Sequence, residues 1–172
     1  SGHHFVFLGG EAAGLHADLS NAQLAWLEET LAKDRVEGRP TFLFLHQGLM
    51  DTVAGTFQYQ NWHGVKQSAQ LRRILRQYPE VVLFSGHSHW TMESAHTVKP
   101  ADSSLPSVVS TASCAYLWDD SCMATNVGIV GSEGYYIYLY ENCLIVRGRS
   151  FDRGEWIGSA QFILPLPTSG GT

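Results

Sequence analysis

Three histidines directly follow mainly apolar segments of the chain, where they could bind a metal ion. His87 and His89 come after the apolar run Val81–Phe84 and the pair Ser85-Gly86, and His46 comes after the run Thr41–Leu45. Short apolar runs of this kind are typical of buried strands in α/β proteins. If the two strands are parallel neighbours, their histidines meet at the carboxyl edge of the sheet, where open α/β sheets bind ligands.

The spacing of His87 and His89 indicates that their side chains point in the same direction. In an extended segment, residues two apart project to the same side, so this pair could hold one cation or two adjacent ones. Two histidines at one strand end are often just hydrogen-bonded polar residues. The addition of His46 from a second strand end favours metal binding, because packing does not explain three converging histidines.

The elements that would position these histidines form a strand–helix–strand unit. Residues 5–8 are expected to be a strand, and Ser20-Asn21-Ala22-Gln23 is a capping-box sequence that opens a helix. Leu24, Leu27 and Leu31 would form the buried face of that helix. A second helix is expected over residues 66–77, between the two strands that end in histidines. Parallel pairing of the strands follows from this order.

The second half of the sequence differs from the first in its predicted secondary structure, with β-rich segments and turn signals. Strands are expected at residues 108–111, 135–140, 144–146 and 162–164, with a hairpin near Glu141-Asn142. The predicted fold is therefore α/β with a mostly antiparallel β C-terminal portion. Residues 1–167 are expected to form a single domain, and residues 168–172 a flexible tail.

Composition narrows the class of protein. The chain has 172 residues, 44% of them hydrophobic and 16% charged, which indicates one folded domain. Its net charge of −5 argues against a nucleic-acid-binding surface, and no apolar run approaches the ~20 residues of a membrane helix. A soluble protein, cytoplasmic or exported, is expected. Cys114, Cys122 and Cys143 are odd in number; a Cys114–Cys122 bridge and free thiols are both compatible with the sequence.

The histidine segments resemble the late motifs of the calcineurin-like metallophosphoesterases. In that family one strand ends in a lone histidine and, after an intervening helix, another ends in Gly-His-x-His. Here these motifs are His46 and Gly86-His87-Ser88-His89. The closer resemblance is to bacterial phosphohydrolases of the family, whose tails read like residues 133–156, and it covers nearly the whole chain.

The early motifs of the family do not occur in this sequence. Asp-x-His, Gly-Asp and Gly-Asn-His-Asp/Glu are all missing, and His16-Ala17-Asp18 has the wrong order and no strand before it. The resemblance therefore implies the C-terminal half of a metallophosphoesterase-type α/β sandwich. The alternative is a relative that has lost its first metal-binding half.

The activity implied by the resemblance is metal-dependent hydrolysis of a small phosphomonoester or phosphodiester. It implies two divalent or trivalent metal ions (Zn, Mn, Fe or Ni), with His46 and His87 binding one and His89 the other. The catalytic groups and remaining ligands would belong to an N-terminal half of the same domain, so this chain alone is expected to be inactive. Two alternatives stay open: a single-metal hydrolase with three histidine ligands, and a non-catalytic binding module on the same fold.

Aromatic residues near the motifs are candidates for substrate binding. Trp90 follows the second motif, and Trp62 and His63 lie in a long loop from Met50 to Gly64. Loops at the carboxyl edge of a sheet often carry binding residues, so Trp62 and Trp90 are expected to form a substrate wall. His63 is a candidate to assist the leaving group. The other interpretation is a loop folded onto its own aromatic residues.

Overall fold

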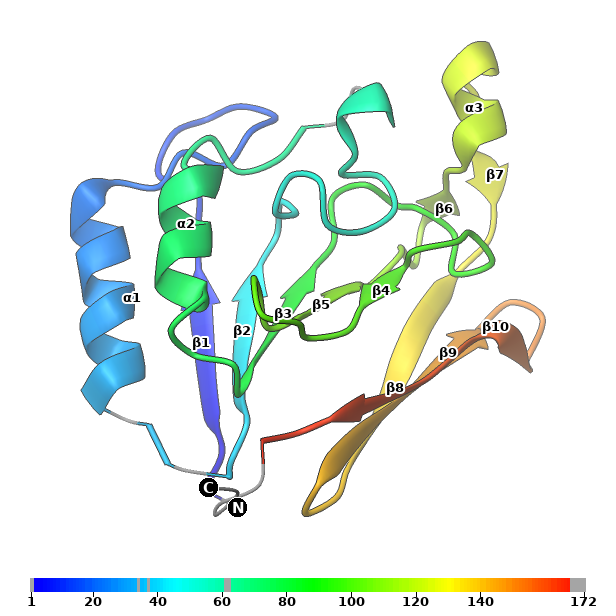
Figure 1. Cartoon of the computed structure of the whole chain (residues 1–172). Helices are drawn as coiled ribbons and strands as arrows, with labels where there is room; N and C mark the ends of the chain where they lie inside the picture. Colours follow the sequence, from blue (N-terminus) through cyan, green and yellow to red (C-terminus); the bar gives the residue numbers. More distant parts are fainter. Residues whose placement is uncertain (1, 34, 37, 61–62, 168–172) are drawn as a thin grey trace.

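The computed structural model describes residues 2–33, 35–36, 38–60 and 63–167, and it has a mixed α/β fold (Figure 1). The expected tail at 168–172 lies outside the described residues. Helices and strands follow one another in this order: β1 His4–Leu8, α1 Asn21–Lys33, β2 Thr41–Leu45, the 3₁₀ turn η1 Gln58–Gln60, α2 Ser68–Leu75, β3 Val81–Ser85, β4 Val98–Lys99, β5 Ser107–Ser110, β6 Tyr116–Leu117, α3 Asp120–Thr125, β7 Ile129–Val130, β8 Glu133–Leu139, β9 Cys143–Ser150 and β10 Glu155–Pro165.

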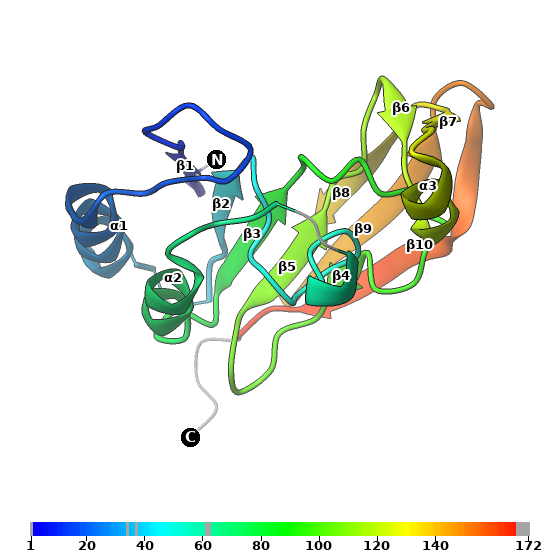
Figure 2. The same cartoon turned by 90° about the horizontal axis from the view of Figure 1, so that it is seen from above.

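The main sheet has the strand order β1-β2-β3-β5-β4. β1, β2, β3 and β5 are parallel to their neighbours, and only the short β4 is antiparallel. α1 lies between β1 and β2 in the chain, and α2 lies between β2 and β3, so the predicted strand–helix–strand units are present (Figure 2). Parallel neighbours end at the same edge, and this edge carries both histidine motifs.

Helix α1 begins as its sequence predicts, with one difference at the cap. The Ser20 hydroxyl accepts a hydrogen bond from the backbone N–H of Gln23, at 3.1 Å. The Gln23 side chain does not return to Ser20. It instead accepts from the N–H of Gly9 and donates to the Gly9 carbonyl, at 3.0 and 2.9 Å, which ties the helix to the exit of β1.

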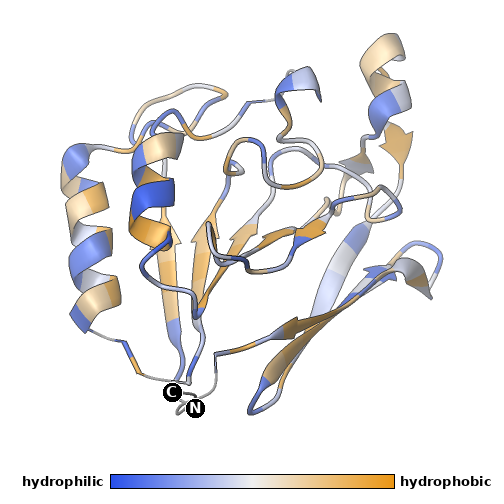
Figure 3. Ribbon diagram, in the orientation of Figure 1, coloured by the Kyte–Doolittle hydropathy of each residue, from blue (hydrophilic) through white to orange (hydrophobic). Residues whose placement is uncertain are grey.

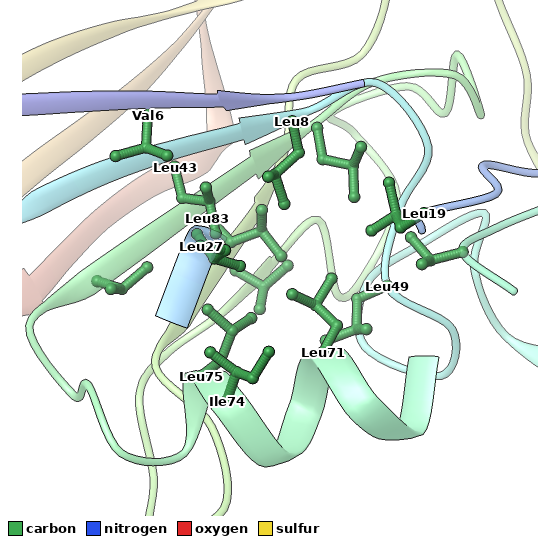
Figure 4. Packing of buried hydrophobic residues seen from close by; sticks show 14 of the residues in the cluster. Val6, Leu8, Leu19, Leu27, Leu43, Leu49, Leu71, Ile74, Leu75 and Leu83 are labelled. Atoms are coloured by element: carbon green, nitrogen blue, oxygen red, sulfur yellow. The ribbon is translucent and has the colours of Figure 1, made fainter. Parts of the chain in front are cut away.

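Alternating side chains divide the interior into two cores, one on each face of the main sheet. Leu43 and Leu83 point toward the helices, where they pack with residues such as Leu71 (Figure 4). Phe42 and Phe84 point the other way, toward the second sheet. Because both faces are covered, β2 and β3 consist mainly of hydrophobic residues (Figure 3). Each fully buried leucine contributes roughly 1.5–3 kcal/mol to stability.

The second sheet has the order β10-β9-β8 and is antiparallel throughout, as predicted for the C-terminal portion. β8 and β9 form the expected hairpin, which closes where the Tyr140 N–H donates to the Cys143 carbonyl at 2.9 Å. Leu144, Val146 and Leu164 of this sheet pack against the main sheet. The two sheets thus bury a common core between them.

A groove of about 620 Å³ separates β1 and β2 from β8, where the second sheet does not cover the main one. Its lining is largely aromatic and aliphatic, and includes Phe5, Phe44 and Ile137. Phe5 packs at a tilt against Phe42, and Phe7 stacks on Phe44, but the two side chains are 59% and 67% exposed. β1 and β8 are each the last strand of their sheet beside this groove.

In the described part of the chain no helix is long and apolar enough to cross a membrane. The three cysteines are free thiols, so the possible Cys114–Cys122 bridge is not formed.

Candidate metal centre

His46 and His87 meet at the carboxyl edge of the main sheet. Phe44 of β2 pairs with Phe84 of β3, so these two parallel strands end side by side. Nε2 of His46 and Nδ1 of His87 are 3.2 Å apart, and the ring planes are inclined at 78°. The Gly86 N–H donates to the His46 carbonyl at 3.0 Å, which fixes the two exit loops relative to each other.

The segment after β3 is not extended, so the geometric basis for placing His87 and His89 on one side was wrong. The φ angles of these two histidines are 66° and 57°, in the left-handed region. The chain turns back directly after the strand, since the Ser88 N–H donates to the Gly86 carbonyl at 2.7 Å. A non-glycine residue in this region costs of order 1–3 kcal/mol, and such strain gathers at functional sites.

His89 lies at the same edge and packs against Tyr116, with ring centroids 4.4 Å apart. Its Nδ1 and the Oγ of Ser85 are buried and have no hydrogen-bond partner among the described residues. Burial lowers the pKa of His89, the backbone of Tyr116 partly offsets this, and His46 adds to it. A buried polar atom without a partner costs about 1–3 kcal/mol, so both atoms are suited to meet a ligand.

The electrostatics of the edge keep His87 neutral. Burial first, and then the neighbouring His46, His63, His89 and His16, lower its pKa from 6.5 to about 4. At neutral pH the imidazole therefore carries a lone pair, the form that binds a metal ion.

A pH effect follows from the lowered pKa of His87. As the pH falls below 6.5, the unfolded chain binds a proton at this residue before the folded chain does, so the metal-free protein should lose stability between pH 6.5 and 4. Below pH 4 both states are protonated and the loss should level off. Urea unfolding at several pH values, in the presence of a chelator, measures the slope. His87→Gln should flatten it, and His96→Gln, at an exposed histidine that packs on Phe57, should not. An unchanged slope in His87→Gln would contradict the electrostatic account.

Sequence reasoning gave no role to His16, which the structure brings into this cluster. Nε2 of His16 and Nδ1 of His63 are 3.1 Å apart, and the ring centroids of His63 and His87 are 6.4 Å apart. His16 lies in the loop between β1 and α1, far from both motifs in sequence. No local pattern in the sequence signals this approach.

The predicted aromatic wall is wrong at Trp90. This side chain is only 1% exposed, because the loop after β2 folds over it, and a Cβ at Gly55 would lie 2.9 Å from its ring. Trp62 lies outside the described residues. Tyr116, which is 48% exposed, is an aromatic residue that the described structure places beside His89.

The loop after β2 is held by polar contacts as well as aromatic ones. The Gln60 amide is buried, accepts from the Gly55 N–H at 2.8 Å and donates to Asp120 at 3.0 Å. Phe57 stacks on Tyr59 at a centroid distance of 5.6 Å. Residues 51–60 of this loop are thus held by contacts within the loop and to α3.

A buried carboxylate holds the loop that follows the second motif. Glu133, the first residue of β8, accepts hydrogen bonds from the Met92 N–H at 2.7 Å and from the Thr91 hydroxyl at 3.1 and 3.2 Å. Burial raises its pKa, and these donors lower it in part. The loop that carries His87 and His89 is therefore anchored to the second sheet.

The fit of this edge to metal ions is partial. Nitrogens bound to one tetrahedral zinc lie about 3.3 Å apart, close to the separation of the His46 and His87 nitrogens. Across the described ranges, however, no group of three or more His, Cys, Asp or Glu side chains is placed to hold a metal ion. His46 and His87 can supply two ligands, and His89 has a free nitrogen at the same edge. No protein-family model matches this chain, and no curated protein matches it.

Proposed function

We propose that the complete protein is a metallophosphoesterase, which hydrolyses a small phosphomonoester or phosphodiester at two metal ions. The observation that carries this proposal is the pairing of His46 Nε2 with His87 Nδ1, 3.2 Å apart at the carboxyl edge of parallel strands. Both residues belong to the motifs that resemble the calcineurin-like family. In this proposal His46 and His87 bind one ion and His89 binds the other.

When bound, two adjacent metal ions supply a strong nucleophile at neutral pH and neutralise charge on the phosphoryl oxygens. The residues of this chain prepare the site for them. His87 stays neutral because of burial and its histidine neighbours. Gly86 and Glu133 hold the two exit loops in place.

A space for the substrate lies beside these ligands. A pocket of about 240 Å³ at the end of the strands is lined by His46, Ser85 and Thr111 among others. The Ser85 hydroxyl, buried without a partner in the described structure, can donate a hydrogen bond to a phosphoryl oxygen there. Tyr116 offers an aromatic face to an aryl or nucleoside group next to His89.

The remaining ligands must come from another segment, which we place in an N-terminal half of the same domain. Two adjacent dications repel strongly unless anionic ligands lie between them, and the ligands that we assign at this edge are all imidazoles. The apolar groove between β1 and β8, each the last strand of its sheet, supports the same conclusion. Strands added there would complete a metallophosphoesterase-type sandwich and cover the exposed Phe5 and Phe7.

The test compares this chain with the same residues extended by an N-terminal half that carries Asp and Asn ligands. Hydrolysis of a chromogenic aryl phosphate or phosphodiester is measured with added Mn²⁺ or Zn²⁺. We expect little or no turnover by the chain alone and metal-dependent turnover by the extended protein. Equal turnover by both, abolished by His89→Ala, would instead support a single-metal enzyme. Bound metal without turnover, in both the chain alone and the extended protein, would favour a non-catalytic binding module.

A further inference from the structure

A second pair of imidazoles lies beside the first and belongs to neither sequence motif. Nε2 of His16 and Nδ1 of His63 are 3.1 Å apart, and the ring planes are inclined at 81°. We propose that His16 and His63 bind a divalent late transition-metal ion such as Zn²⁺, as a site separate from the His46–His87 pair. The ring centroids of His63 and His87 are 6.4 Å apart, so the two sites are neighbours.

The backbone brings the two histidines together independently of any metal. Ala17 and Val65 form a parallel β-bridge, in which the Ala17 N–H donates to the Gly64 carbonyl at 3.1 Å. The Lys66 N–H donates to the Ala17 carbonyl at 2.9 Å. The Asp18 carboxylate pairs with the Lys66 ammonium at 2.7 Å. These contacts flank both histidines, so little ordering is required when an ion binds.

A second contact orients the His16 ring. Its Nδ1 lies 3.3 Å from the Gly64 carbonyl oxygen, to which it donates when protonated; when unprotonated it accepts from the Gly64 N–H, also at 3.3 Å. When Nδ1–H donates to the carbonyl, Nε2 keeps its lone pair and faces His63. Histidines that bind metals usually donate their other N–H in this way, which fixes the tautomer and the ring orientation.

The separation of the two nitrogens suits a shared ion. Two nitrogens bound to one tetrahedral zinc, each at ~2.0–2.1 Å, lie about 3.3 Å apart. Without an ion, one ring must donate a hydrogen bond to the other. Imidazole pairs favour Zn²⁺, Ni²⁺ and Cu²⁺ over Mg²⁺ and Ca²⁺, which prefer oxygen ligands. His16 and His63 would supply two of the ligands, and water or an anion would fill the remaining positions.

The experiment counts Zn²⁺ ions on the full chain by isothermal titration calorimetry after removal of metal. The background variant is His46→Asn/His87→Asn/His89→Asn, which removes the first site while asparagine tolerates the left-handed backbone at positions 87 and 89. We expect this protein to bind one Zn²⁺. Adding His16→Asn or His63→Asn should weaken that binding at least about tenfold. His96→Asn is the matched control and should leave it unchanged.

Further measurements separate lost metal binding from misfolding and identify the ligands. Thermal unfolding with a chelator present should be alike for the background variant with and without His16→Asn, because His16 is exposed. If the background variant does not fold, Zn²⁺ is counted on His16→Asn/His63→Asn made in the protein that keeps His46, His87 and His89. This variant should bind one Zn²⁺ fewer per chain than the unsubstituted protein. Electron paramagnetic resonance of bound Cu²⁺ should show coupling to two nitrogens.

Failure of this inference is distinct from failure of the proposed activity. No Zn²⁺ binding in the folded background variant would show that the two rings form only a hydrogen bond. Binding that persists in both His16→Asn and His63→Asn would place the ion elsewhere. Neither result depends on hydrolysis, and a complete protein without phosphoesterase activity would leave the Zn²⁺ count at this pair as predicted.

Discussion

Replacing His87 with asparagine should lower kcat/KM of the complete protein for phosphate-ester hydrolysis by at least about 100-fold. Loss of residues that only support a metal ligand costs 10–100-fold, and His87 is proposed as a ligand itself. Asparagine is the suited substitution because it tolerates the left-handed backbone at this position, where φ is 66°. The effect should therefore report lost metal binding rather than a disturbed loop.

The measurement is initial rate against substrate concentration, together with metal content per chain. His87→Asn should lose one ion in preference to the other, and His96→Asn, outside the cluster, should retain both ions and full activity. A variant that keeps both wild-type kcat/KM and its full metal content would refute the ligand role of His87. Equal loss of both ions would show that the two sites are too strongly coupled for separate assignments.

Replacing Trp90 with alanine should destabilise the fold by about 3–5 kcal/mol, the range for removing a large buried aromatic side chain. Trp90 is 1% exposed, and its main chain forms a bridge with Trp118. Its ring lies under the loop that contains Gly55, so removal leaves a cavity below the histidine loops. The sequence had instead favoured an exposed ring that contacts substrate.

Urea denaturation measures this effect, with Trp26→Ala as control because Trp26 is 48% exposed on α1. The control should change the free energy of unfolding by about 0.5 kcal/mol or less. A loss below about 1 kcal/mol in Trp90→Ala, with KM raised, would restore the substrate-wall interpretation.

The approach of His46 to His87 could be predicted because each step has a strong signal in the sequence. Apolar runs mark β2 and β3, a helix between them implies parallel pairing, and parallel strands end at one edge. The left-handed turns at His87 and His89 could not be predicted, since Gly-His-Ser-His carries no residue that demands them. They arise in the turn directly after β3, where the Ser88 N–H donates to the Gly86 carbonyl.

The errors at Trp90 and His16 have one cause, which is contact between segments distant in sequence. Trp90 is buried by the loop that follows β2, some 35 residues earlier in the chain. His16 meets His63 only because Ala17 and Val65 pair, 48 residues apart. Exposure and proximity of this kind depend on how loops fold over one another, and neither periodicity nor motif spacing encodes it.

The anchoring of Met92 by Glu133 also bears on the order in which the protein becomes competent during synthesis. Strands β1 to β5 can pair once residue 110 has left the ribosome, and the apolar core beneath α1 and α2 can close around them. The loop after His89 still lacks its buried acceptor at that point, because Glu133 begins a strand 41 residues later in the chain. A nascent chain or a proteolytic fragment that stops before β8 would therefore hold its sheet, with the loop after His89 still bonded to Trp118 but without its anchor at Glu133. The loop after His89 is thus expected to reach its final order only when the second sheet has formed.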